Sequence, residues 1–349
     1  MRFIGNKENL LDKIDAAIEK HGVKGESFFD FFSGTTSVAR FYKKKGLKIF
    51  SSDLLYFSYC LQKAYIENNI TPKFDTLIQN IKTEKTSLFE TPLEKIILFL
   101  NNLPPKRGFV YKNYTPGGTR NLKIPRMYFS DENGEKIDAI RIKLEEWFKC
   151  GLLNESEYFI LLASLIESVP FYANISGVFA AFQKKWDPRA VKPFVLRNIS
   201  VISGKTENKC FNCDSLSLLE DVDADILYLD PPYNERQYAP NYHLLETIAK
   251  YDNPDIKGVT GMRDYTGQKS DFCNKSKAMS CIKKILDKGR FRHLLFSYNS
   301  EGLLSKDEIF SVLELYGKVF LEEMDYPRFK SNASTSRTPL KEYLFILSR

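Results

Sequence analysis

The sequence has 349 residues, of which 43% are hydrophobic and 27% charged, and its formal net charge is +7. This composition is typical of a soluble globular protein, and the mild positive charge is compatible with a polyanionic partner without requiring one. There is no apolar run of membrane-spanning length, no signal-peptide core and no zinc-type arrangement of the six cysteines and three histidines, so we expect a cytoplasmic protein that binds no metal.

The first sixty residues predict a helix followed by a β-α-β unit. Apolar residues recur at helical spacing over 10–18, and residues 28–32 form an apolar strand that contains Asp30. A turn of small residues, 33–37, leads into a second helix, and the next strand ends at Asp53. Such a turn lets a ligand approach the N–H groups at a helix start, and an acid about 20 residues later suits ribose hydroxyls. One glycine favours a nucleoside over a dinucleotide, although such a turn can also serve packing alone.

The middle of the chain predicts helices interrupted by basic, aromatic loops. Residues 60–103 and 135–170 carry apolar residues at helical spacing, which we interpret as core. Residues 104–134 are rich in Gly and Pro and interleave basic side chains with tyrosines, and residues 171–197 again mix aromatic with basic side chains. Such loops suit contacts with phosphates and bases, so both are candidate nucleic-acid surfaces. The alternative for the first is an ordinary solvated loop.

A strand at 226–229 ends in Asp230-Pro231-Pro232-Tyr233. Neither proline can donate to a ladder, so the strand must stop there and leave Asp230 at its carboxyl end, where open α/β sheets bind ligands. A carboxylate, a free carbonyl and an aromatic face suit a planar ring that bears an amino group. The alternative is a plain strand end with Asp230 as a helix cap.

The C-terminal third returns to α/β character. A short strand at 210–213 precedes Asp214 and Ser215, helices are predicted over 240–251 and 276–288, and further strands over 293–298, 319–324 and 342–347. The polar stretch 330–337 predicts a loop between the last two strands.

Together these motifs resemble the D12-class, alpha-type (Dam-like) N6-adenine-specific DNA methyltransferases of restriction–modification systems. That family has an Asp-Pro-Pro-Tyr motif, found here at 230–233, a cofactor motif D-x-F-x-G-x-G, found at 30–36, and an F-x-G-x-K motif, found at 3–7. The resemblance covers nearly the whole chain. One position departs: the second glycine of the cofactor motif is Thr36, which would be strained if its φ were positive.

The resemblance implies a Rossmann-like, S-adenosylmethionine-dependent methyltransferase sheet with helices on both faces, plus an inserted, mainly helical target-recognition domain. Residues 1–73 and 201–349 would form the catalytic domain, and residues 74–200 the insert. The implied activity is transfer of a methyl group from S-adenosylmethionine to N6 of an adenine flipped out of duplex DNA, which protects host DNA from restriction.

The same resemblance assigns roles to individual residues. Catalysis would rest on Asp230, Pro231, Pro232 and Tyr233. Asp53 would hold the cofactor ribose, Asp214 its adenine, and Asp30 its methionine part; the full set of expected cofactor residues is Phe3, Gly5, Lys7, Asp30, Phe32, Ser33, Gly34, Asp53, Leu54, Asp214, Ser215 and Asp230. The candidates for DNA binding are Arg120, Arg126, Lys184, Lys185, Arg236, Tyr238 and Asn241.

We expect double-stranded DNA as the partner, a monomer, and at most a cognate restriction endonuclease that forms no stable complex with the chain. Two alternatives remain open. One is methylation of RNA adenine or another planar amide, and the other is an inactive DNA-binding subunit, which would predict loss of side chains at Asp230, Pro231 or Tyr233; all three are present.

Overall fold

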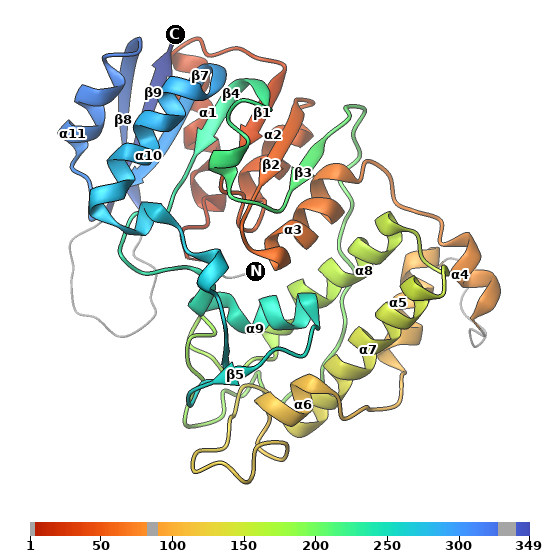
Figure 1. The fold of residues 1–349 in the computed structure, drawn as a ribbon. Coiled ribbons are helices and arrows are strands. Elements are labelled where there is room, and N and C mark those ends of the chain that lie inside the picture. Colours follow the sequence, from red (N-terminus) through yellow and green to blue (C-terminus); the bar gives the residue numbers. More distant parts are fainter. Residues whose placement is uncertain (1–3, 82–89, 327–339) are drawn as a thin grey trace. The chain divides into compact units, whose positions relative to one another are not determined.

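The computed structural model describes residues 4–81, 90–326 and 340–349, which form two compact units (Figure 1). Among the described residues, those of 4–62, 202–239 and 266–349 form the sheet unit, and those of 63–201 and 240–265 form the helical unit. Phe3 and the polar stretch 330–337 lie outside the described residues. No helix of the described chain is long and apolar enough to cross a membrane.

Seven described strands of the sheet unit form one sheet in the order β3-β2-β1-β4-β7-β9-β8. The first five are parallel to one another, and β9 runs antiparallel to both β7 and β8. The strands are β1 (Ser27–Asp30), β2 (Lys48–Ser52), β3 (Lys209–Phe211), β4 (Asp223–Leu229), β7 (Arg290–Asn299), β8 (Lys318–Tyr326) and β9 (Leu340–Ser348).

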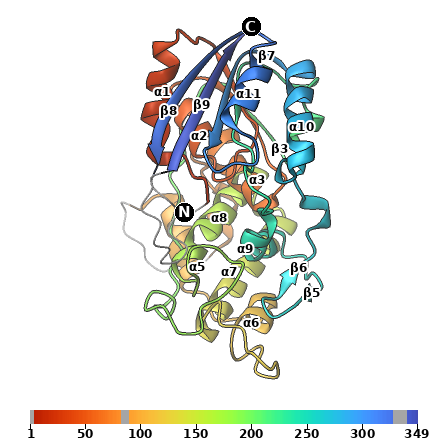
Figure 2. The ribbon, with the colours of Figure 1, turned by 90° about the vertical axis from the view of Figure 1, so that its left-hand side faces the viewer.

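Helices cover both faces of this sheet because its central strands are apolar on both sides. Phe28 and Phe29 of β1 point to opposite faces and are both buried, as expected for a parallel strand between two helical layers. Figures 1 and 2 show α1 (Leu11–Lys20) and α2 (Ser37–Lys44) on one face, and α10 (Lys275–Lys288) and α11 (Lys306–Leu313) on the other. The predicted Rossmann-like α/β class is therefore confirmed.

The strand order reverses between β1 and β4. From β1 the chain moves outward through β2 and β3, whereas β4 begins the other half of the sheet. Asp30, the last residue of β1, pairs in register with Tyr228 of β4, so the ends of these two strands lie side by side. Ligands of open α/β sheets bind outside the carboxyl ends of the strands at such a switch point.

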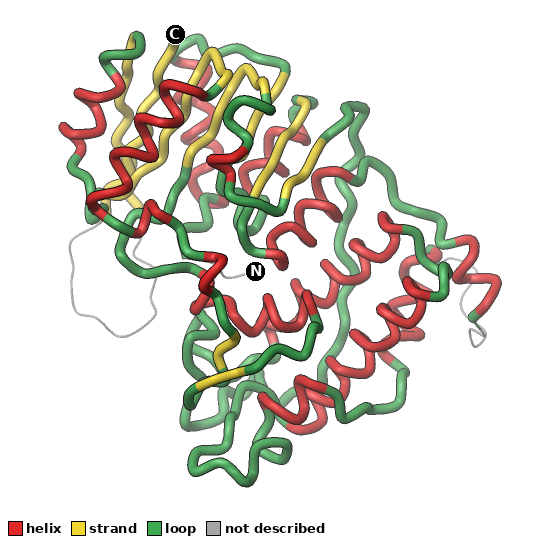
Figure 3. The backbone as a smooth tube through the Cα atoms, viewed as in Figure 1, coloured by secondary structure: helices red, strands yellow, loops and turns green. Residues whose placement is uncertain are grey.

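As far as it is described, the helical unit consists of helices and loops apart from a short hairpin (Figure 3). At its centre lies α8 (Glu155–Ser168), which is buried on most of its surface and whose start is fixed by a capping box between Asn154 and Glu157. The other described α-helices and strands are α4 (Asp75–Asn80), α5 (Pro92–Asn101), α6 (Phe109–Tyr114), α7 (Asp131–Lys149), α9 (Ala239–Lys250), which begins at the unit boundary, β5 (Ile256–Lys257) and β6 (Met262–Arg263).

Residues 63–73 and 240–265 group with the helical unit, whereas the sequence predicts both segments in the catalytic domain. For residues 240–265 the reason is a set of buried side-chain to main-chain hydrogen bonds that no sequence pattern reveals. The guanidinium of Arg141 on α7 donates to the carbonyls of Ile248 and Ala249 at 2.9 and 3.0 Å, and the Tyr114 hydroxyl donates to the carbonyl of Gly261 at 2.8 Å. The insert is therefore completed by a second, later segment.

Candidate active site

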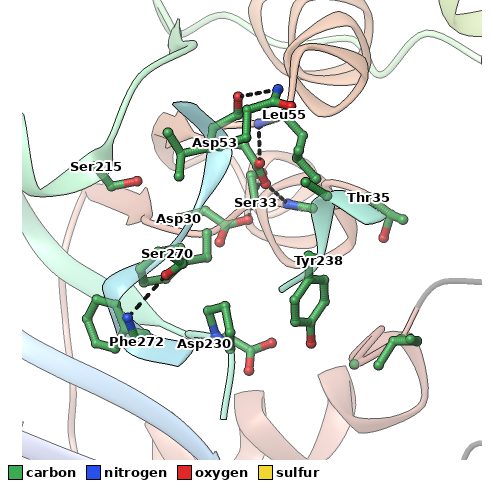
Figure 4. A pocket seen from close by; sticks show the side chains of 18 of the residues that line it. Asp30, Ser33, Thr35, Asp53, Leu55, Ser215, Asp230, Tyr238, Ser270 and Phe272 are labelled. Atoms are coloured by element: carbon green, nitrogen blue, oxygen red, sulfur yellow. Dashed lines mark hydrogen bonds between the residues drawn. The ribbon is translucent and has the colours of Figure 1, made fainter. Parts of the chain in front are cut away.

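The carboxyl ends of the strands border a cavity in the sheet unit. Its volume is about 1180 Å³ including the open mouth, which is ample for a nucleoside-sized ligand. Asp30 ends β1, while Asp53, Asp214 and Asp230 follow β2, β3 and β4, and all four line the cavity. Figure 4 shows the side chains of Asp30, Asp53 and Asp230 around this common space. The sheet topology thus brings together acids that the sequence spreads over 200 positions.

Asp30 is the buried anchor of the turn between β1 and α2. One of its oxygens, Oδ2, accepts a hydrogen bond from the Ser33 hydroxyl at 3.0 Å and from the Ala39 N–H at 3.3 Å. Burial, which the bond from Ser33 only partly offsets, raises the pKa of Asp30 to about 7. The carboxyl group therefore holds the turn in place from beneath and presents acceptor character to the cavity.

Asp53 connects the end of β2 to the same turn. Its Oδ2 accepts from the Gly34 N–H and its Oδ1 from the Leu55 N–H, both at 2.8 Å. Each carboxylate oxygen has a second acceptor site, so the side chain is oriented by the main chain and can still receive a ligand hydroxyl. Gly34 has a φ of +50°, in the left-handed region that glycine adopts without strain.

Thr36 also lies in the left-handed region, with a φ of +64°. This is the position where the family motif has its second glycine, so the strain anticipated from the sequence is present and costs about 1–2 kcal/mol for a residue with a β-carbon. The buried side chain donates from Oγ1 to the carbonyl of Thr35 at 2.5 Å. Thr35 and Ser37 line the cavity but Thr36 does not, so the substitution strains the backbone without narrowing the cavity.

Asp214 and Ser215 stand where β3 ends. Asp214 caps a short 3-10 helix, Ser215–Ser217, by accepting from the Leu216 N–H at 3.1 Å, and it also lines the cavity. The buried Ser215 hydroxyl donates to the carbonyl of Phe31 at 2.6 Å and accepts from the Ser52 hydroxyl at 2.9 Å. Ser215 therefore ties together the ends of three strands, and the expected residues Phe32 and Leu54 complete this wall.

The Asp-Pro-Pro-Tyr motif begins directly after β4, as its prolines predict. Pro231 is buried and Pro232 lines the cavity. The Tyr233 carbonyl accepts from the Leu303 N–H at 2.9 Å, and its ring lies edge-on to Tyr298 at a centroid distance of 6.4 Å. The motif is thus anchored from the far side by the segment that follows β7, which restrains the orientation of its side chains.

A buried charge cluster holds Asp230. The Lys7 ammonium lies 3.1 Å from Oδ1 of Asp230 and 2.7 Å from Oε1 of Glu342 on β9. Burial raises the pKa of Asp230 to about 7 against the opposing effect of Lys7. Burial alone would lower the pKa of Lys7, but the carboxylates of Asp230 and Glu342 raise it well above its usual value. The lysine therefore stays charged while Asp230 titrates near neutral pH.

This cluster bears on the expected role of Lys7 as a cofactor residue, and it adds Glu342 to the site. Lys7 lines the cavity, as does Gly5, but its ammonium is directed to Asp230 and Glu342. Sequence reasoning missed Glu342 altogether. The available signal was an acid near the start of a predicted strand whose next five residues are apolar or aromatic, because a carboxylate on such a buried strand requires a partner.

A second group that the sequence did not reveal consists of Gln237 and residues 268–272. Gln237 donates from Nε2 to the Ser270 carbonyl at 3.0 Å and accepts from the Ser270 N–H at 2.8 Å, which joins the two segments at the cavity wall. Phe272 also lines the cavity (Figure 4). Its ring packs edge-on against that of Phe32, with 5.2 Å between the ring centroids. No periodicity or motif in the sequence marked residues 268–272.

The candidate DNA-binding residues are divided between the units. Arg120, Lys184 and Lys185 are exposed in the helical unit, where Asn241 is half-buried on α9. Arg236 is exposed in the sheet unit. Tyr238 lines the cavity there, and its hydroxyl is close enough to Gly5 to touch any side chain at that position. Their contacts with DNA remain predictions.

Arg126 must be withdrawn from that group. It is only 7% exposed, and its guanidinium donates to the carbonyls of Asn113, Gly258 and Val259, each at 3.0 Å. A guanidinium with these main-chain partners joins the segment between α6 and α7 to the turn of the hairpin and is not presented to a phosphate. The sequence of a Gly/Pro-rich loop does not show whether a basic side chain in it points into the protein or toward solvent.

The described residues contain no group of three or more His, Cys, Asp or Glu side chains that could hold a metal ion. The chemistry of the cavity wall is instead that of hydrogen-bond acceptors, with the carboxylates of Asp30, Asp53, Asp214 and Asp230 around one open space. Such a wall suits a ligand that carries hydroxyl and amino donors and positive charge.

Comparisons with known proteins agree on one family. A model of the D12 class N6 adenine-specific DNA methyltransferases matches residues 3–312. The type II methyltransferase M.FokI of Planomicrobium okeanokoites is 43% identical over 354 residues, covering 100% of this chain and 53% of that protein. The modification methylase StsI of Streptococcus sanguinis is 36% identical over 356 residues, covering 100% and 52%. The type II methyltransferase M.NlaIII of Neisseria lactamica is 35% identical over 357 residues, covering 100% and 99%. The chain spans about half the length of the first two relatives.

Proposed function

Since the chain belongs to the D12 class N6 adenine-specific DNA methyltransferases, we propose that it transfers a methyl group from S-adenosylmethionine to the N6 amino group of an adenine in duplex DNA. The observation that carries this proposal is the end of β4, where Asp230-Pro231-Pro232-Tyr233 follows the strand at the switch point of the sheet and where Asp230 and Pro232 line the acid-lined cavity. In this proposal, the Asp230 carboxylate and the Pro231 carbonyl would both accept from one planar amine.

The cavity fits S-adenosylmethionine, whose sulfonium and amino groups are cationic and whose ribose and adenine offer donors. Asp53, already oriented by two N–H groups, would receive the ribose hydroxyls. Asp214 would accept from the adenine amino group, and Asp30 with Ser33 would surround the amino-acid part. When bound, this cofactor supplies a methyl group that is already a strong electrophile.

The residues of the chain contribute positioning and electrostatics. An exocyclic amine is a poor nucleophile because its lone pair is delocalised into the ring. The Asp230 carboxylate and the Pro231 carbonyl would each accept one N6–H bond, which favours tetrahedral nitrogen and directs its lone pair away from the ring plane. Asp230 must be ionised for its carboxylate to accept this N6–H bond with full negative charge. Its pKa, raised to about 7, therefore predicts loss of activity as the pH falls below about 7.

The target adenine has to leave the duplex, because its N6 atom cannot be reached inside the base stack. Tyr233 would stack on the flipped base, a contact worth about 1–3 kcal/mol. The helical unit would serve as the target-recognition region, with Arg120, Lys184, Lys185 and Asn241 as its contacts and Arg236 and Tyr238 contributed by the sheet unit.

We also propose the biological setting. The enzyme would act as a monomer in the cytoplasm and would protect host DNA within a restriction–modification system, with any cognate endonuclease acting separately. The proposed substrates, duplex DNA and S-adenosylmethionine, and the separately acting endonuclease follow from this class of reaction.

A transfer assay with tritiated S-adenosylmethionine tests the proposal. We expect label to enter duplex DNA as N6-methyladenine, RNA to remain unlabelled, and Asp230→Ala to abolish transfer. Asp223→Ala serves as the matched control, because Asp223 is an exposed acid at the opposite end of the same strand. Label found only in RNA, or full activity of Asp230→Ala, would refute the assignment. If DNA is labelled as expected, methylation-aware sequencing of DNA from expressing cells identifies the sequence that is methylated.

A further inference from the structure

Glu342 is a buried acid that the proposed reaction does not use directly. It lies on β9, opposite Asn299 of β7, and is only 2% exposed. Its Oε1 accepts from the Lys7 ammonium and from the Ser297 hydroxyl, both at 2.7 Å. Burying a carboxylate is unfavourable unless it is paired and hydrogen-bonded. Packing alone therefore does not explain why an acid occupies this position.

Lys7 connects Glu342 with Asp230. The shorter of its two contacts is to Glu342, at 2.7 Å, and the longer is to Oδ1 of Asp230, at 3.1 Å. A lysine side chain is a flexible stem with three donors, so one partner alone leaves its ammonium free to move. Two fixed acceptors, of which Glu342 belongs to the sheet and is itself held by Ser297, confine the ammonium to one place.

Resting on the function proposed above, we infer that Glu342 is a positioning residue for methyl transfer: it holds the Lys7 ammonium against one oxygen of Asp230 and limits how far that ammonium neutralises the Asp230 carboxylate. The ammonium fixes the rotation of the carboxylate through Oδ1, which directs Oδ2 to the target amine. Because Glu342 takes a share of the positive charge, Asp230 keeps the acceptor strength that the reaction requires.

The charged and titratable groups around Asp230 come from five segments. Among the described residues they are Lys7 from the N-terminal segment, Asp30 at the end of β1, Tyr228 on β4, Glu342 on β9 and, through its interaction with Lys7, Tyr233 in the motif itself. Burial raises the pKa of Asp230, Lys7 opposes this rise, and Glu342 adds to it. Removing the charge of Glu342 must therefore make Asp230 more acidic, whereas removing the charge of Lys7 must make it less acidic.

The test measures the titration of Asp230 in full-length Glu342→Gln and Lys7→Met. Carbon-13 NMR of protein labelled at the aspartate carboxyl carbons follows this titration directly, and Asp230→Asn identifies the signal. The pH profile of single-turnover methylation is recorded in parallel. Glu323→Gln is the matched control. Glu323 lies on the edge strand β8, where it pairs with Lys306 and Lys341, and it does not contact the cluster.

We expect the Asp230 midpoint to move down by about one pH unit in Glu342→Gln and up by at least as much in Lys7→Met, with the acid limb of the methylation profile following each shift and Glu323→Gln leaving both unchanged. An unmoved midpoint in Glu342→Gln would overturn the inference, since a purely structural role predicts lower yield or rate without a shift. If Lys7→Met does not fold, the sign of the Glu342→Gln shift decides alone. Opposite NMR shifts without any methylation by the wild type would refute the proposed function while leaving the coupling of Glu342 to Asp230 intact.

Discussion

Replacing Asp230 by Asn separates what this carboxylate costs the fold from what it does in the proposed reaction. Asp230 and Glu342 share the ammonium of Lys7, so the cluster carries one surplus negative charge when both acids are ionised. Burial of that charge is unfavourable, and accordingly burial raises the pKa of Asp230 from its ordinary value of 3.8 to about 7. Asn keeps the shape and an acceptor oxygen for Lys7 but removes the charge.

The sign and size of the effect follow from linkage. An acid whose pKa is higher in the folded chain destabilises the fold as the pH rises above the unfolded value, and this cost stops growing above the folded value. A rise from 3.8 to about 7 corresponds to about 4 kcal/mol. At pH 8 we therefore expect Asp230→Asn to exceed the wild type in free energy of unfolding by up to about 4 kcal/mol, and at pH 5 by less than half of that.

The assay is urea denaturation at the two pH values, followed by far-ultraviolet circular dichroism. Tryptophan fluorescence is unsuitable for this purpose, because Trp147 and Trp186 both lie in the helical unit while the substitution is in the sheet unit. In the same variant, methyl transfer should fall by at least about 100-fold, the usual cost of removing one preorganised electrostatic contact to a reacting group.

Two results would refute this reasoning. A variant that is less stable than the wild type at pH 8, or whose stability difference is the same at both pH values, would show that Asp230 does not carry the surplus charge. A variant that methylates DNA at the wild-type rate would show that its carboxylate is not needed. Asp223→Asn, at the exposed end of β4, should change neither property.

Five further substitutions, at four positions, test other parts of the molecule. Asp53→Asn should weaken binding of S-adenosylmethionine about tenfold in calorimetry, because a charged acceptor for the ribose is lost, and an unchanged dissociation constant would contradict the ribose role. Arg120→Glu and Lys185→Glu should each weaken DNA binding and lower the slope of log affinity against log salt by about 1; if neither changed affinity, the helical unit would not be the DNA-binding region. At Thr36, with its φ of +64°, a Gly variant should be more stable than an Ala variant by about 1–2 kcal/mol, with cofactor affinity unchanged in both, and equal stabilities would argue against backbone strain.

Sequence reasoning failed where local structure depends on distant side chains. Helix α6 lies in a stretch rich in Gly and Pro, yet the N–H groups of Val110 and Tyr111 in its first turn donate to the Asp138 carboxylate on α7 at 2.9 and 2.8 Å. The cap is supplied from almost thirty positions away, so no local motif predicts it. The prediction that Arg126 binds DNA fails for the same reason. Its hydrogen-bond partners on residues 258–259 come from a later part of the chain.

By itself the sequence determined the order of strands and helices around the site, the stop of β4 at the two prolines, and the acids that follow the strand ends. These features are local: they rest on apolar periodicity, on the missing N–H groups of proline, and on motif spacing, all of which can be read within a few residues. The resemblance to a methyltransferase family rests on the same local motifs.

Only the tertiary structure decided which charges meet. Lys7 and Glu342 are separated by 335 positions, and nothing near either residue indicates that both contact Asp230. Their meeting depends on β9 entering the sheet antiparallel beside β7 and on the N-terminal segment lying against the end of β4, and hydrophobic patterning does not specify such a pairing between distant segments. The ionisation of the proposed catalytic acid is therefore a property of the folded sheet.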